Sequence, residues 1–241
     1  MTEAFGLSDT GCVRANNEDC YRIEADLGLY LLADGMGGAK AGERASELAV
    51  DTVVRVFSQT AERDAQVLLR AVETANSSVL ALSKTDTSLE GMGTTLVAAL
   101  DLGDELLIAS VGDSRLYVLD ADSFRGVTED QSWVNEVGRP LGLDEASLRA
   151  HPLRNVLTMA IGAGSHLVVN SYRIPWKPGS LALLSSDGLH GVVAREELEN
   201  ILRSPDLLPA KCKRFIDAAR AAGAPDNVTA VLLRRAADTA N

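Results

Sequence analysis

The sequence predicts an α+β fold built on antiparallel β-sheet, and three observations favour it. Two amphipathic helices follow one another directly instead of alternating with strands. The strand-like segments come in groups joined by short turns, which is typical of antiparallel hairpins. The regular strand–helix–strand repeat of a parallel sheet is not evident along the chain.

The first part of the chain predicts short strands followed by two helices. Residues up to about 32 alternate between polar and apolar and carry turn-forming residues, so strands are expected there. Apolar residues then recur every three or four positions, which predicts a helix. The inner face of this helix holds Ala45, Leu48, Ala49, Thr52, Val53, Val56 and Phe57. A second helix has its inner face at Leu68, Ala71, Val72, Ala75, Val79 and Leu82. We expect both to pack on the core and to carry no catalytic residue.

The rest of the chain predicts mainly strands, with one more helix. The strands are expected at residues 94–100, 105–111, 115–119, 167–174, 180–184 and 228–234. Residues 128–163 form a polar segment in which we expect mostly loop. A C-terminal helix stops at Gly223, a suitable residue for a helix end. Its buried side chains are expected to be Leu208, Cys212, Phe215, Ile216 and Ala219.

Length, charge and cysteine content limit the class of protein. One domain over residues 1–241 is expected, because no linker-like or repeated segment interrupts the chain. The net charge of −11 argues against a nucleic-acid partner, since phosphate backbones are bound by an excess of Lys and Arg. Three isolated cysteines suggest neither a disulfide framework nor a zinc ribbon. No signal peptide or membrane-spanning run is evident, so we expect a soluble cytoplasmic protein without a membrane partner.

Three aspartates stand where an apolar run meets a tight turn. Asp34 ends the run Leu-Tyr-Leu-Leu-Ala, Asp187 follows Leu-Ala-Leu-Leu-Ser-Ser, and Asp226 comes shortly before Val-Thr-Ala-Val-Leu-Leu. An acid at the end of a buried strand is held at the edge of a rigid sheet. Three such carboxylates, if they converge, suit hard divalent cations such as Mg²⁺ or Mn²⁺.

Taken singly, each aspartate also fits an ordinary turn, because Asp-Gly is a common turn dipeptide. Asp34 stands out because the glycines in Gly35-Met36-Gly37-Gly38 let the backbone approach an ion and offer it a carbonyl. A zinc or iron site built on imidazoles is not expected, since the three histidines show no ligand spacing.

Two further segments add charged groups. Arg14 precedes Glu18 and Asp19. An arginine fork matches phosphate oxygens, and the alternative is a surface ion pair with one of the two acids. Asp113 lies in the turn Gly-Asp-Ser between two predicted strands, where a plain β-turn explains it equally well.

Five segments, in this order, together resemble one protein family. They are V-R-x-x-N-E-D, L-x-A-D-G-M-G-G, V-G-D-S-R, S-S-D-G-L and P-D-N-V-T, with further likeness at residues 92–95 and 151–158. The set closely resembles the metal-dependent serine/threonine phosphatases of the protein phosphatase 2C family, in their small bacterial form, over about residues 7–233. This resemblance implies two antiparallel β-sheets in a sandwich flanked by helix pairs (αββα), with a dinuclear metal centre at one end.

The resemblance also implies a set of metal ligands. Asp34 would bridge both metals and the Gly35 carbonyl would ligate one of them, while Asp187 and Asp226 would hold the other. Asp113 would serve a third, weaker site together with Asp187. Glu18 would act mostly through metal-bound waters. The cations implied are Mn²⁺ or Mg²⁺.

Arg14 and Asp19 are the catalytic residues that the resemblance implies. Arg14 would clamp the substrate phosphate, and Asp19 would act through metal-bound water. The implied reaction is hydrolysis of phosphoserine and phosphothreonine on proteins, by a hydroxide that bridges the two metals. Phosphorylated proteins and a cognate serine/threonine kinase are the implied partners. Two alternatives stay open: a catalytically silent binding or regulatory domain of this fold, and a metal-dependent hydrolase of small phosphate esters.

Three positions depart from patterns within the family. Met36 stands where eukaryotic members carry a histidine proposed as general acid, so water or another group must protonate the leaving group. Gln131 replaces a frequent histidine and Met159 a frequent arginine. We expect both replacements to affect substrate preference more than activity.

Overall fold

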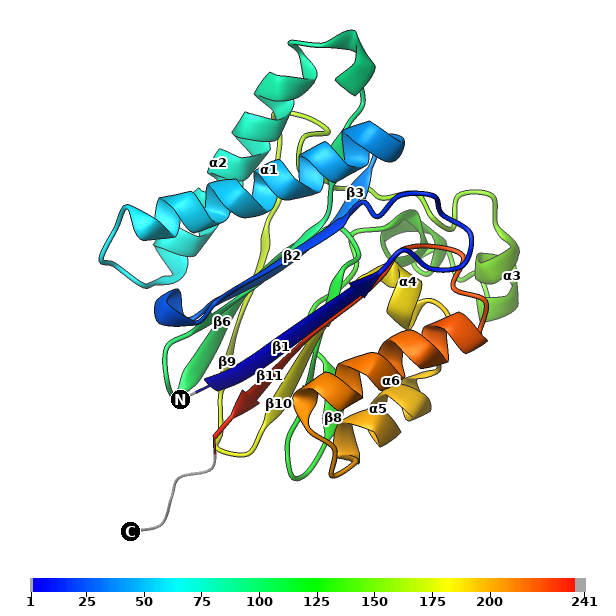
Figure 1. The fold of residues 1–241 in the computed structure, drawn as a ribbon. Helices are drawn as coiled ribbons and strands as arrows, with labels where there is room; N and C mark the ends of the chain where they lie inside the picture. The colour runs from blue at the N-terminus through cyan, green and yellow to red at the C-terminus, as the bar shows by residue number, and fades with distance from the viewer. Residues whose placement is uncertain (1, 237–241) are drawn as a thin grey trace.

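Two antiparallel β-sheets lie face to face in the computed structural model, which describes residues 2–236 (Figure 1). The first sheet has the strand order β1 (Thr2–Asp9), β11 (Val228–Arg235), β10 (Leu181–Ser185), β7 (Arg115–Leu119) and β8 (Phe124–Gly126). The second has the order β2 (Asp19–Glu24), β3 (Leu29–Met36), β5 (Leu96–Asp101), β6 (Glu105–Val111) and β9 (Asn170–Pro175). The two-residue β4 (Gly93–Thr94) pairs with the end of β3.

A helix pair covers the outer face of each sheet (Figure 1). The second sheet packs against α1 (Ala39–Ser58) and α2 (Ala65–Ser83), and the first against α5 (Arg195–Arg203) and α6 (Leu208–Ala221). Two shorter helices, α3 (Glu145–Ala150) and α4 (Asp187–His190), come after β8 and β10. The predicted α+β sandwich with αββα layers is confirmed.

Alternation along the strands explains the layers. In β3, Leu29, Leu31 and Ala33 pack with α1 and α2, whereas Tyr30 and Leu32 pack in the core between the sheets. Successive side chains of a strand point to opposite faces, so a strand covered on both sides needs an unbroken apolar run. A central strand of this sandwich therefore requires the same apolar run that predicted a buried strand in the sequence.

The largest differences from the predicted elements concern short ones. The segment 128–163 is not all loop, because it contains a π-helical turn at Val134–Gly138 and α3. The three-residue β8 and the nine-residue α5 were not predicted. Helix α5 buries Leu198, Ile201 and Leu202, which recur at i, i+3 and i+4, so a short helical period is present in the sequence there. Helix α6 ends two residues before Gly223, which has a left-handed φ of 99°.

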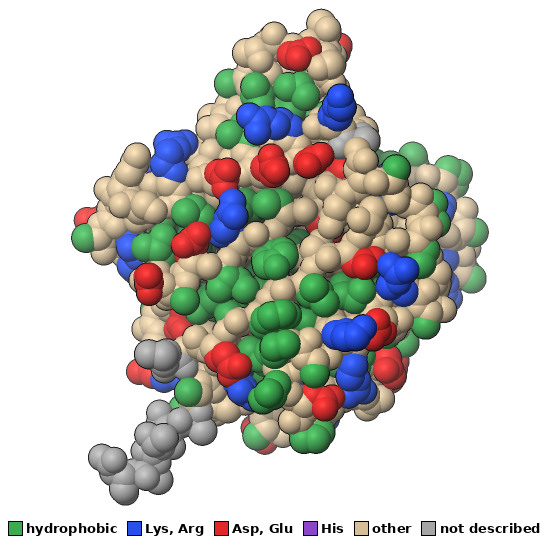
Figure 2. All heavy atoms as spheres, in the orientation of Figure 1, with side chains coloured by type: hydrophobic (Ala, Val, Ile, Leu, Met, Phe, Trp, Pro, Cys, Tyr) green, Lys and Arg blue, Asp and Glu red, His purple; other side chains and the backbone are tan. Residues whose placement is uncertain are grey.

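The predicted domain, residues 1–241, includes residue 1 and residues 237–241, which lie outside the described part of the chain. No helix within residues 2–236 is long and apolar enough to cross a bilayer. On the face shown in Figure 2, acidic and basic side chains are interspersed over α1 and α6. Hydrophobic side chains lie between them, where β1 and β2 run side by side.

Candidate metal and phosphate site

The space between the sheets is polar at one end. In β3 the inward-facing series Tyr30 and Leu32 ends at Asp34, and Asp19 of β2 is the cross-strand partner of Asp34. Directly opposed residues on neighbouring strands share a face of the sheet. Both carboxylates therefore enter the same end of the sandwich. The apolar core between the sheets stops where these acids begin.

A cavity of about 280 Å³ opens at this polar end. Seven of the eight predicted site residues line it, namely Arg14, Glu18, Asp34, Gly35, Asp113, Asp187 and Asp226. The eighth, Asp19, is not among the lining residues. The segment 128–163 contributes Asn155 and Leu157 to the lining, so it forms part of the wall of the cavity.

Thr94 and Thr95 hold the end of β3 in place. The Asp34 N–H donates to Thr95 Oγ1 (2.9 Å), and the Thr94 hydroxyl donates to the Asp34 carbonyl (2.8 Å). At Gly35 a Cβ atom would overlap main-chain atoms of α1 and the Glu18 carbonyl. Glycine is therefore required for this close approach. The strand end that carries Asp34 is fixed against the start of α1.

Asp187 is the first residue of α4, and only Ser186 separates it from the end of β10. A Cβ atom on Gly188 would overlap the carbonyl oxygen of Asn227. The turn that carries Asp226 and the start of α4 can thus meet only because residue 188 has no side chain. This contact explains how Asp187 and Asp226 come to line the same cavity.

Asn227 ties the loop that carries Arg14 and Glu18 to the turn at Asp226. Its buried side chain accepts from the Glu18 N–H (2.8 Å) and donates to the carbonyls of Thr10 (3.0 Å) and Asn16 (2.8 Å). A buried amide with all these partners holds the loop in one conformation. Asn227 is therefore a positioning residue for the cavity.

Two hydroxyls hold Asp19, one from β11 of the first sheet and one from the residue before α4. Its Oδ2 accepts from Ser186 Oγ (2.8 Å) and from Thr229 Oγ1 (2.6 Å), whereas its buried Oδ1 has no hydrogen-bond partner within the described residues. Burial raises the pKa of Asp19 to about 7, and the charges of Asp187 and Asp226 add to this. A buried carboxylate oxygen without a partner is costly, so Oδ1 offers an acceptor to a water or a cation.

Burial and mutual repulsion raise the pKa values of Asp34, Asp113 and Asp187 at the cavity. Burial, and then the charges of Asp19 and Asp187, raise the pKa of Asp34 well above its usual range. Burial and Asp187 raise the pKa of Asp113 to about 7, and burial and Asp226 raise that of Asp187. Carboxylates this close together stay ionised only beside compensating positive charge.

The donor atoms fit hard divalent cations. Carboxylate, amide and main-chain oxygens surround the cavity, and neither His nor Cys lines it. Mg²⁺ and Mn²⁺ prefer such oxygen ligands. Of the residues that the structure describes, no three acidic, histidine or cysteine side chains form a closed ion site. Water and main-chain oxygens would therefore complete the coordination, as is usual for Mg²⁺.

Arg14 lies at the cavity, but its ionic partner differs from the alternative weighed from the sequence. It donates to Asp226 Oδ2 (2.6 Å), not to Glu18 or Asp19. This hydrogen bond raises the pKa of Arg14, which stays cationic. The side chain is half exposed, so its remaining N–H groups are accessible to a phosphate at the cavity mouth.

The three departures from the family's patterns lie in different places. Met36 lines the cavity and has no proton to donate. Gln131 is buried, accepts from the Gly112 N–H (2.9 Å) and donates to the Val168 carbonyl (2.9 Å), so it positions the turn before Asp113. Met159 packs partly buried against the core under α1 and α2. Gln131 and Met159 therefore make structural contacts, and their effect on substrate preference stays a prediction.

Two histidines have structural surroundings. His190 bonds through Nδ1 to the Ser185 hydroxyl (2.9 Å), and burial lowers its pKa well below the usual range. His151 stacks on Trp133 at a centroid distance of 3.9 Å. His190 is therefore neutral at pH 7, as expected of a structural residue.

Sequence reasoning singled out the acids but missed the residues that hold them. The signal was present, because Thr95 and Thr229 are polar at positions where alternation predicts an inward-facing side chain. Asn227 had no such signal, since its partners come from a loop near the opposite end of the chain.

Comparison with known proteins finds that the chain is similar to serine/threonine phosphatases. It is 35% identical over 236 residues to the serine/threonine phosphatase stp of Listeria innocua, covering 95% of this chain and 94% of that protein. The solved S. agalactiae serine/threonine phosphatase superposes with a TM-score of 0.91 at 30% identity, covering 98% of this chain and all of that one. The catalytic domain of the phosphatase PstP, solved with two manganese ions, gives a TM-score of 0.86 at 32% identity over 97% of each chain.

The model of the family described as protein phosphatase 2C matches residues 14–232. This range contains all eight residues that the sequence singled out for the site. The chain belongs to the protein phosphatase 2C family.

Proposed function

We propose that this metal-dependent serine/threonine protein phosphatase hydrolyses phosphoserine and phosphothreonine on proteins at the cavity between its two sheets. The carrying observation is the cavity itself, where Glu18, Asp34, Asp113, Asp187 and Asp226 meet around about 280 Å³. Such a concentration of carboxylates at the end of a rigid sandwich, with the pKa values of Asp34, Asp113 and Asp187 raised, is typical of a functional site.

Two divalent cations are proposed to bind here. Asp34, the Gly35 carbonyl, Asp187 and Asp226 would hold them, and Asp113 with Asp187 would serve a third, weaker site. Mn²⁺ is favoured by the relative solved with two manganese ions, and Mg²⁺ suits the same oxygen ligands. When bound, such cations lower the pKa of a water and withdraw charge from a phosphoryl group.

The protein's own groups then bind and orient the substrate. Arg14 would leave or share Asp226 and donate its fork to the phosphate. Glu18 and Asp19 would hold waters in place, since Oδ1 of Asp19 is an acceptor without a protein partner. Met36 cannot donate a proton, so the leaving serine or threonine oxygen takes its proton from water.

The biological setting is proposed by extension. Phosphorylated proteins would be the substrates, a serine/threonine kinase would supply them, and the cytoplasm would be the compartment. Residues 1–241 would act as one phosphatase domain, since the two sheets share one inner core.

Phosphate release from a phosphothreonine peptide tests the proposal. We expect release with Mn²⁺ or Mg²⁺, none with EDTA, and loss of release in Asp187→Asn, which keeps the shape but removes the charge. The matched control is Asp217→Asn, an exposed acid paired with Lys213 on α6, and it should stay active. Folded protein that releases no phosphate under any metal would show a binding domain, and release from nucleotides alone would show a small-ester hydrolase.

A further inference from the structure

A second cavity adjoins the one that holds the acids. Its volume is about 470 Å³, and the two cavities share Asp113, Asn155 and Asp187 as lining residues. One wall comes from the segment between β8 and β9, and the other from the ends of β7 and α4. A peptide whose phosphorylated residue enters the first cavity therefore has the second directly beside it.

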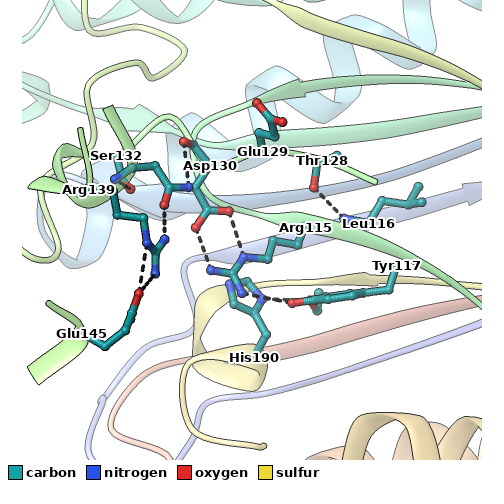
Figure 3. Close-up of polar contacts among 12 residues, drawn as sticks. Arg115, Leu116, Tyr117, Thr128, Glu129, Asp130, Ser132, Arg139, Glu145 and His190 are labelled. Carbon is teal, nitrogen blue, oxygen red and sulfur yellow. Dashed lines mark hydrogen bonds and ion pairs between the residues drawn. The ribbon is translucent and has the colours of Figure 1, made fainter. Parts of the chain in front are cut away.

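Four arginines line the second cavity, and two of them are paired. Arg115 donates to both carboxylate oxygens of Asp130 (2.8 and 2.7 Å), and Arg139 donates to Glu145 (2.8 Å; Figure 3). These pairs cancel their own charges and brace the wall of the cavity. The net charge of the second cavity is therefore set by its other lining residues.

Arg149 and Arg154 are the other two arginines, and both are exposed. Among residues 2–236 neither side chain makes a hydrogen bond or an ion pair. The remaining acids of the lining are Asp113 and Asp187, which face the cations of the proposed function. The two arginines are then free to meet an anion from a ligand.

The same segment exposes large apolar side chains. Val137 and Leu141 lie before α3, and Leu153 and Val156 after it, with exposed fractions between 37% and 71%. Cations mixed with accessible apolar groups suit a polypeptide surface better than a free ion, which makes no use of apolar contacts.

We propose that the second cavity binds an anionic side chain of the substrate protein, a carboxylate or a second phosphate, close in sequence to the phosphorylated serine or threonine. Arg149 and Arg154 supply the positive charge. This inference rests on the proposed function, because it assumes that a phosphorylated residue occupies the first cavity. The protein is then selective for acidic or multiply phosphorylated sites.

Peptide kinetics test the proposal. The substrates are a series of peptides derived from one neutral phosphothreonine peptide. Each has a single Glu, or a single second phosphothreonine, at one position between four residues before and four residues after the phosphorylated residue. Each peptide is compared with its Gln or Thr counterpart. We expect one or two positions at which the anion raises kcat/KM by about 2- to 30-fold, the effect of pairing with two exposed cations. The Glu and phosphothreonine series show which anion source the site takes.

Variants then assign the effect to the two arginines. Arg149→Gln with Arg154→Gln should bring the acidic-to-neutral ratio of kcat/KM to about one, and Arg149→Glu with Arg154→Glu should favour a Lys-containing peptide. The matched control, Arg55→Gln with Arg70→Gln, removes two exposed arginines from α1 and α2 and should keep the ratio.

The possible outcomes separate this inference from the proposed function. Metal-dependent release with equal kcat/KM for all peptides, or a preference that survives the Arg149 and Arg154 double variant, overturns the second site alone. Failure to release phosphate from any peptide overturns the proposed function instead.

Discussion

Replacing Asn227 with alanine should loosen the site without touching any acid. The change removes three hydrogen bonds, to the Glu18 N–H and to the carbonyls of Thr10 and Asn16. Each of these buried hydrogen bonds contributes about 1 kcal/mol net to stability. The expected loss in the free energy of unfolding is therefore about 3 kcal/mol. For a chain of this size that lowers the Tm by about 6–12 °C.

The same change should also weaken metal binding and catalysis, because the loop with Arg14 and Glu18 loses its anchor. Urea unfolding gives the free energy, Mn²⁺ titration gives the metal affinity, and peptide kinetics give kcat and KM. Asn76→Ala is the matched control. This buried asparagine of α2 bonds the Gly162 N–H (2.7 Å) and the Gly164 carbonyl (3.0 Å), so its loss should lower stability alone.

The reasoning about Asn227 is refuted by either of two results. One is a loss of stability below about 1 kcal/mol, which would mean that the three bonds are replaced by water. The other is a Mn²⁺ affinity equal to that of the wild type in a clearly destabilised variant. The anchor would then not position the site.

Three further predictions concern pH, a glycine and a buried lysine. The pKa values of Asp19 and Asp113 are raised to about 7, so the folded protein binds more protons than the unfolded chain between about pH 4 and pH 7. In EDTA the free energy of unfolding should fall as pH rises through this window, by on the order of 4 kcal/mol per carboxyl at most. Mn²⁺ should reverse the loss at pH 7, because cations bind the ionised form. A free energy of unfolding that does not change with pH in EDTA contradicts this prediction. Gly188→Ala should lower kcat by about 10²-fold, because the added methyl group separates α4 from the Asp226 turn. The control Gly164→Ala has open space around its Cβ position and should stay active. Equal kcat values for the two variants would disprove the close contact at Gly188. Lys211→Met should lower the free energy of unfolding by about 2–3 kcal/mol, because the carbonyls of Ile201, Leu202 and Ser204 lose their donor. Urea unfolding measures this loss, and phosphatase activity should be retained. The control Lys213→Met, at an exposed position of the same helix, should leave the free energy of unfolding nearly unchanged.

Much of the fold could be predicted because the information is local. The buried run in β3 and the helical period in α1 depend only on which neighbours are apolar. Helix α5 could have been predicted in the same way, because Leu198, Ile201 and Leu202 recur at i, i+3 and i+4. Strand β8 has three residues, too few to show an alternation, and depends on its pairing with β7.

The site divides in the same way. That Asp34, Asp187 and Asp226 end buried runs is visible in the sequence, and so is their suitability for hard cations. That they share one cavity depends on the pairing of strands and on contacts such as that of Gly188 with Asn227. No local pattern encodes such contacts.

The sequence by itself determined the kind of chemistry: oxygen ligands, a phosphate-binding arginine and a layered sandwich to hold them. Only the tertiary structure decided the partners. It paired Arg14 with Asp226 and brought two hydroxyls within hydrogen-bond distance of Asp19. It also placed Arg149 and Arg154 in the lining of the second cavity. The physical reason is that residue type and periodicity follow from local composition, whereas charge pairing and burial depend on distances between segments that only the folded chain brings together.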